Sequence, residues 1–175
     1  VFNKASGEMR HPVGERVMQP KFLGGESPEV GDRDRREVLA EWIASADNPY
    51  FARHMANTIW AHFFHRGIVD DPDDVRVSNP PVNQELLTAI ASRLKQYRFD
   101  PRRLIRDICN SRTYQLSIEP NATNLADEEN FARAHLRRLG ASVLLDTISQ
   151  VTDTTDSFEQ TPAGTRAVQL PDGAV

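Results

Sequence analysis

Three histidines, His54, His62 and His65, lie in a segment whose apolar spacing predicts a helix. His62 and His65 are three residues apart, so they share a helix face and could bind a metal ion together. His54 is eleven residues from His65, which is about 16 Å along a helix, so one ion cannot bind all three. All three fall on the polar side of the helix. The simpler interpretation is therefore solvent-facing or interface histidines, with a metal site at His62 and His65 as the alternative.

Four aspartates occupy a five-residue run, at Asp70, Asp71, Asp73 and Asp74. Hard cations such as calcium take oxygen ligands of this kind, but the spacing and the distal glutamate of an EF-hand loop are missing. The simpler interpretation is a solvated turn whose acids pair with Arg66, Arg76 or the next helix N-terminus. Asp73 and Asp74 could also form a catalytic acid pair, although the sequence places no nucleophile or base beside them.

Few other residues suggest cofactor or covalent chemistry. The single cysteine, Cys109, excludes an internal disulfide and any centre built from several cysteines. Its position on an apolar helix face predicts a buried, unreactive thiol. The sequence contains no glycine-rich phosphate loop, no G-x-S-x-G motif and no haem-attachment motif. We therefore expect no cofactor and no metal in this segment.

Composition narrows the class of protein further. The 175 residues suit one domain, with 39% hydrophobic and 26% charged residues. With 21 basic and 25 acidic side chains the net charge is −4, and there is no basic block, which argues against nucleic-acid binding. No apolar run reaches the roughly 18 residues of a membrane span.

Helical spacing of apolar residues recurs in five segments. They run from Asp34 to Asn48, Pro49 to Phe64, Asn83 to Tyr97, Pro101 to the turn at 113–115, and 128 to 151. We expect Gly67 to end the second helix in a left-handed conformation, and Gly140 could interrupt the fifth. The pattern predicts an all-α fold of about five helices in an orthogonal or irregular bundle, with the second helix at its core.

The same pattern divides the chain into three regions. Residues 1–31 are rich in glycine and proline and predict an irregular arm with a possible short β-hairpin. Residues 32–151 form the helical domain. Residues 152–175 predict a polar, mobile tail. Because neither end looks like a natural terminus, we expect the chain to be a piece of a longer protein.

Several short motifs occur in order along the chain. They are Asp47-Asn48-Pro49-Tyr50-Phe51-Ala52-Arg53, Asn57-Thr58-Ile59-Trp60, Phe64-His65-Arg66-Gly67-Ile68-Val69, Pro72-Asp73-Asp74, Asn79-Pro80-Pro81 and Ser111-Arg112-Thr113-Tyr114-Gln115. Together they resemble the planctomycete-specific domain of unknown function of the PSD type. The resemblance extends from Pro20 to Pro171, and the chain departs from the family pattern at Thr58, His65 and Ser142.

The resemblance implies a context rather than an activity. Domains of this type lie toward the C-terminus of large secreted planctomycete proteins, many with a cytochrome-c-like module upstream. It therefore implies an extracytoplasmic location, haem only in another module, and other domains of the parent protein as partners. The sequence specifies no oligomeric state.

The sequence supports three hypotheses about function. The first is a non-catalytic helical module that packs on its parent protein or on a partner. The second is part of an enzyme acting on extracellular polymers such as polysaccharide, with a polar cleft around Arg53, Asn57, Arg66 and Asp74. The wider set of candidate catalytic residues is Arg53, Asn57, Arg66, Asp73, Asp74 and Tyr114. The third is an accessory role in electron transfer with the cytochrome-c module, which rests on the resemblance alone.

Overall fold

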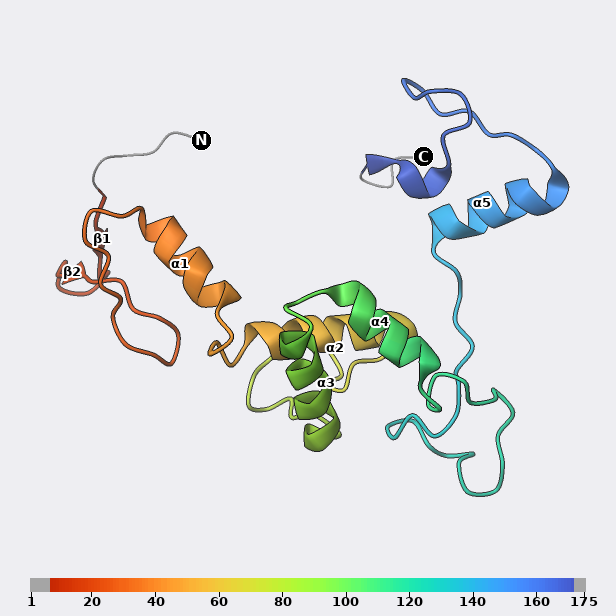
Figure 1. Cartoon of the computed structure of the whole chain (residues 1–175), viewed down its shortest axis with the longest axis horizontal. Helices are drawn as coiled ribbons and strands as arrows, with labels where there is room; N and C mark the ends of the chain where they lie inside the picture. The colour runs from red at the N-terminus through yellow and green to blue at the C-terminus, as the bar shows by residue number, and fades with distance from the viewer. Residues whose placement is uncertain (1–6, 172–175) are drawn as a thin grey trace.

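The computed structural model describes residues 7–171 (Figure 1). Within this range the elements are β1 (Met9–Arg10), β2 (Val17–Met18), α1 (Arg35–Ala44), α2 (Phe51–Phe64), α3 (Gln84–Gln96), α4 (Pro101–Asn110), α5 (Ala141–Thr152) and the 3-10 helix η1 (Ala167–Gln169). The predicted all-α class with about five helices is confirmed. The first six residues of the predicted arm and the last four of the predicted tail lie outside the described residues.

Three helices begin within one residue of their predicted starts, and a side chain caps each of them. The side chains of Asp34, Asn83 and Asp100 accept hydrogen bonds from backbone N–H groups in the first turns of α1, α3 and α4. These bonds satisfy donors that have no partner inside the helix. Pro101 occupies the first position of α4, where its missing N–H costs nothing.

The hydrophobic core lies where α2, α3 and α4 contact one another. Its buried members are Ala52, Ala56, Trp60, Ile68, Val69, Leu87, Ile90, Ala91, Leu94, Leu104, Ile108 and Phe131. The Trp60 ring stacks on Phe64 with centroids 4.0 Å apart and meets Phe131 edge-on at 5.3 Å. The expectation that the second helix supplies the core is confirmed. Cys109 is half-buried rather than buried.

The fifth helix is shorter than predicted, because residues 128–140 are not helical. The Asp127 carboxylate accepts hydrogen bonds from the backbone N–H groups of Asn130 and Ala132 at 2.9 Å, which folds a turn here. Phe131 then takes the left-handed conformation, with φ of 56°, and enters the core against Trp60. Burial of this aromatic ring offsets the backbone strain and prevents a helix.

The left-handed residue that ends α2 is His65, with φ of 65°, rather than the predicted Gly67. The chain therefore reverses two residues earlier than expected. As a result the backbone at 67–69 runs back along the helix and reaches the side chain of Asn57.

The N-terminal elements form one flank of the molecule (Figure 1). The predicted hairpin is present, since β1 and β2 pair antiparallel. The Phe22 ring stacks on Trp42 of α1, with centroids 4.9 Å apart. In α1 only Val38 is buried, so most of its predicted apolar face remains accessible.

The C-terminal elements form the other flank (Figure 1). No residue of α5 is buried, and the helix packs on η1, which lies in the predicted tail. The Asp146 carboxylate accepts from the backbone N–H of Ala167 at 2.7 Å and joins the two elements. Among the described helices, none combines the length and apolar content that a membrane crossing requires.

Candidate functional site

A buried amide on α2 organises the loop between α2 and α3, residues 65–83, hereafter the α2–α3 loop. Asn57 Oδ1 accepts from the backbone N–H of Ile68 at 2.7 Å and of Val69 at 3.0 Å, and its Nδ2 donates to the Val69 carbonyl at 3.0 Å. The Ile68 carbonyl accepts from the N–H of Val82 at 2.8 Å, which closes the neck of the loop. One side chain therefore fixes where the loop leaves the core.

Gly67 permits this arrangement because backbone and side-chain atoms approach its Cα closely, and not because its φ is positive. A Cβ atom at this position would lie 2.0 Å from the Val69 carbonyl oxygen and 2.9 Å from Asn57 Nδ2. Neither distance is compatible with a side chain, so the loop requires glycine here.

The acidic run forms a turn inside this loop. Asp70 lies 2.8 Å from Arg66 Nε, and Asp74 accepts from Arg76 Nε at 2.6 Å. The hydrogen bond from Arg76 holds the pKa of the Asp74 carboxyl below its ordinary value. The predicted pairing of this run with Arg66 and Arg76 is confirmed for these two aspartates.

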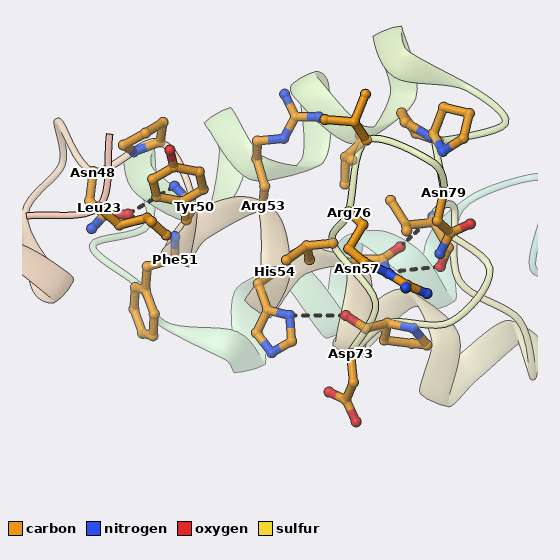
Figure 2. Close-up of a pocket in the computed structure, with 18 of the residues that line it drawn as sticks. Leu23, Asn48, Tyr50, Phe51, Arg53, His54, Asn57, Asp73, Arg76 and Asn79 are labelled. Carbon is orange, nitrogen blue, oxygen red and sulfur yellow. Dashed lines mark hydrogen bonds between the residues drawn. The ribbon is translucent and has the colours of Figure 1, made fainter. Parts of the chain in front are cut away.

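Two further contacts tie the loop and α2 to their neighbours. His54 Nδ1 lies 3.1 Å from the Pro72 carbonyl oxygen, within hydrogen-bond distance (Figure 2). Arg53 Nη2 donates to Gln84 Oε1 of α3 at 3.1 Å. The loop is therefore supported along the side of α2.

Asn48 joins α1 to α2, and sequence reasoning missed its role. Its Oδ1 accepts from the N–H groups of Tyr50 at 2.8 Å and Phe51 at 2.9 Å, and its Nδ2 donates to the Trp42 carbonyl at 3.2 Å. Asparagine just before a helix is a common cap, so the sequence Asn48-Pro49 carried this signal.

These supports frame a groove with a cavity volume of about 680 Å³ (Figure 2). Its walls are the end of α1, the first half of α2 and the α2–α3 loop. The side chains that define the groove are Leu23, Trp42, Ile43, Asn48, Pro49, Tyr50, Phe51, Arg53, His54, Asn57, Val69, Pro72, Asp73, Val75, Arg76, Val77, Asn79, Pro80, Pro81 and Leu87. Most of them are apolar, and Asp73 is the one acidic residue among them.

Comparison with known proteins places the chain in a family. Residues 35–171 match the model of PSD1, described as a protein of unknown function (DUF1553). The chain belongs to the PSD1 family. No curated protein and no solved structure matches it. The family match excludes the N-terminal arm, although Leu23 of that arm lines the groove.

The structure separates the predicted site residues of this PSD1 domain. Arg53, Asn57 and Asp73 line the groove, but the Asp73 carboxylate points away from Arg53 (Figure 2). Asp74 lies in the same loop without lining the groove, and Arg66 instead donates to the Glu128 carbonyl at 2.5 Å.

The remaining candidates lie near the other end of α2. Tyr114 packs its ring edge-on against Phe63 and Phe64, with centroids 5.8 and 5.9 Å away. His62 and His65 are both exposed. Between residues 7 and 171 no three His, Cys, Asp or Glu side chains gather closely enough to hold a metal ion.

Proposed function

We propose that this PSD1 chain is a non-catalytic packing module of a larger secreted polypeptide, and that the groove packs on another domain of that polypeptide. The observation that carries the proposal is the exposed apolar rim of the groove. Val77 is 100% exposed, Leu23 69% and Val75 67%. A cluster of exposed apolar side chains around a mostly apolar groove is typical of a surface that a partner covers.

The bonding of the polar candidates supports a structural role. Asn57 uses its amide on the backbone of residues 68–69, and Asp74 pairs with Arg76. Arg66 joins Asp70 to the Glu128 carbonyl. Side chains committed in this way hold loops in place and have few donors or acceptors left for a substrate.

The course of the chain favours a domain that precedes this one as the partner. The family resemblance implies further modules upstream. The arm that leads into α1 contributes Leu23 to the groove and stacks Phe22 on Trp42. A domain joined to this arm would therefore lie next to the groove.

Calorimetric titration of the preceding domain into the 175-residue chain tests this proposal. We expect saturable binding that Val77→Asp weakens about tenfold or more, because a carboxylate would be buried without a partner. Val13→Asp is the matched control, since Val13 is 77% exposed but lies in the hairpin, outside the groove. Absence of binding, or equal losses in both variants, would contradict the proposal.

A second candidate function is an enzyme acting on extracellular polymers. It is favoured by one observation, that Arg53, His54 and Asp73 line the same groove, whose volume suits a ligand. If it is right, the chain should release reducing ends from one member of a polysaccharide panel, and Arg53→Met should abolish the release. Arg102→Met, on the exposed side of α4, should leave it unchanged. A wild-type chain that cleaves no member contradicts this function.

A further inference from the structure

A second cavity, of about 270 Å³, lies at the C-terminal end of α2. Three segments distant in sequence form it: the end of α2, the turn after α4 and the extended stretch that comes after Phe131. The side chains that define it are Phe63, Phe64, His65, Thr113, Tyr114, Phe131, Arg133, Ala134, His135 and Arg137. This cavity shares no residue with the groove, so its chemistry is independent of the proposed packing role.

The walls of this cavity carry basic groups without acidic ones. Four of the ten side chains are basic, namely His65, Arg133, His135 and Arg137, and none is acidic. Within residues 7–171 no carboxylate forms an ion pair with Arg133 or Arg137. Because arginine stays charged in proteins, two guanidinium groups around one small cavity attract an anion and repel a cation.

The two arginines are bonded differently. Arg137 Nη1 donates to the His62 carbonyl at 2.5 Å, so it covers the carbonyl end of α2, which would otherwise repel an anion. Arg133 Nε is buried and has no hydrogen-bond partner in the described part of the chain. A buried donor without an acceptor is unfavourable, and such a group calls for an explanation. Arg133 thus carries a buried donor without an acceptor, and the residue lines a cavity whose walls hold no acidic side chain.

We propose that this cavity binds an oxyanion, a phosphate or sulfate group, with Arg133 as its main donor. The planar guanidinium presents donors in a fork that matches the oxygens of such groups. Arg137 adds positive charge, and Tyr114, which also lines the cavity, carries a hydroxyl that can donate a hydrogen bond. The aromatic rings of Phe63, Phe64 and Phe131 form an apolar wall, which suits an oxyanion carried as an ester on a ring.

Thermal unfolding of the full chain in inorganic phosphate, inorganic sulfate and chloride at equal ionic strength tests the proposal. We expect phosphate or sulfate to raise Tm saturably, by about 3–6 °C at ten times Kd, while chloride does not. The Nε–Hε resonance of Arg133 in NMR spectra should shift along the same titration. Phosphate and sulfate effects no larger than that of chloride would overturn the proposal.

Two variants of equal charge distinguish a built site from general attraction to a basic surface. Arg133→Met should weaken phosphate binding about tenfold or more, because it removes the main donor. Arg138→Met removes the same charge from an exposed neighbour that does not line the cavity, and it should leave the affinity unchanged. Arg133→Lys keeps the charge and should bind with intermediate affinity, which gives a second variant if Arg133→Met fails to fold. Equal losses for Arg133→Met and Arg138→Met would contradict a specific site.

Binding measurements with phenyl phosphate and benzoate show which class of ligand the cavity prefers. Tighter binding of phenyl phosphate than of inorganic phosphate would support the site and identify an ester, with its ring against the aromatic wall. Equal binding would support the site and identify the free ion. Binding of benzoate without binding of phosphate or sulfate would overturn the assignment to this class.

Discussion

Asn57 on α2 bonds both backbone groups of Val69, accepting from its N–H at 3.0 Å and donating to its carbonyl at 3.0 Å. The side-chain amide thereby bonds both backbone groups of a residue twelve positions later in the sequence. The pairing directs the α2–α3 loop back over α2 and sets one wall of the groove. An asparagine that the sequence presented as a catalytic candidate is placed as a structural clamp.

The first prediction concerns this clamp. Asn57→Ala should lower the free energy of unfolding by about 2–4 kcal/mol, because it leaves buried backbone donors and an acceptor at 68–69 without partners. Thr58→Ala, on the exposed face of the same helix, should change it by less than about 0.5 kcal/mol. Urea unfolding followed by circular dichroism measures both. A small loss in Asn57→Ala would show that the loop does not depend on the amide.

The second prediction concerns the close approach at Gly67. Gly67→Ala should destabilise the fold by about 1–3 kcal/mol, since the new methyl group would overlap the Val69 carbonyl. Gly7→Ala serves as the control, because a Cβ there meets nothing within 4 Å. The same urea experiment applies, and similar midpoints for the two variants would refute the steric argument.

The third prediction concerns acid stability at the turn before Phe131. Backbone N–H groups, first that of Ala132 and then that of Asn130, lower the pKa of Asp127 to about 2. An unfolded aspartate titrates near pH 4, so this carboxylate stabilises the fold above that pH. The stabilisation should be lost as the pH falls from about 4 to 2.

Asp127→Asn should therefore show a smaller drop in urea midpoint between pH 4 and pH 2 than the wild type. A drop should remain, because a hydrogen bond from Arg36 also lowers the pKa of Asp34 to about 2. Glu129→Gln, an exposed neighbour in the same turn, should behave like the wild type. If the urea midpoint of Asp127→Asn falls as much between pH 4 and pH 2 as that of the wild type, the Asp127 carboxylate does not stabilise the turn as described.

The fourth prediction concerns the contact between α5 and η1. Asp146→Ala removes the acceptor for the Ala167 N–H and the carboxylate that lies 3.4 Å from Arg166 Nε. Tryptic cleavage after Arg166 should become about tenfold faster, because η1 would open more often. Gln150→Ala, on an exposed position of α5, should leave the rate unchanged. Identical cleavage rates in the two variants would mean that Asp146 does not hold η1.

Features that depend on neighbouring residues, such as helix starts, could be predicted from the sequence. The starts of α1, α3 and α4 follow from Asp34, Asn83 and Asp100, because a cap acts on N–H groups two or three residues away. The apolar period of α2 likewise predicts its role in the core. Asn48 was within reach of the same reasoning, since it also bonds residues two and three positions ahead.

The features that the sequence did not predict depend on contacts between residues far apart in the chain. Phe131 leaves its predicted helix because Trp60, 71 positions earlier, offers it a buried site. The oxyanion cavity joins His65, Tyr114 and Arg133, and no periodicity relates residues so far apart. Sequence alone thus determined the family, through motifs that occur in order along the chain. It also determined the helical class and most helix starts, because these depend on neighbouring residues. Tertiary structure alone decided which polar residues act as clamps and which face an open cavity, because that depends on how distant segments pack.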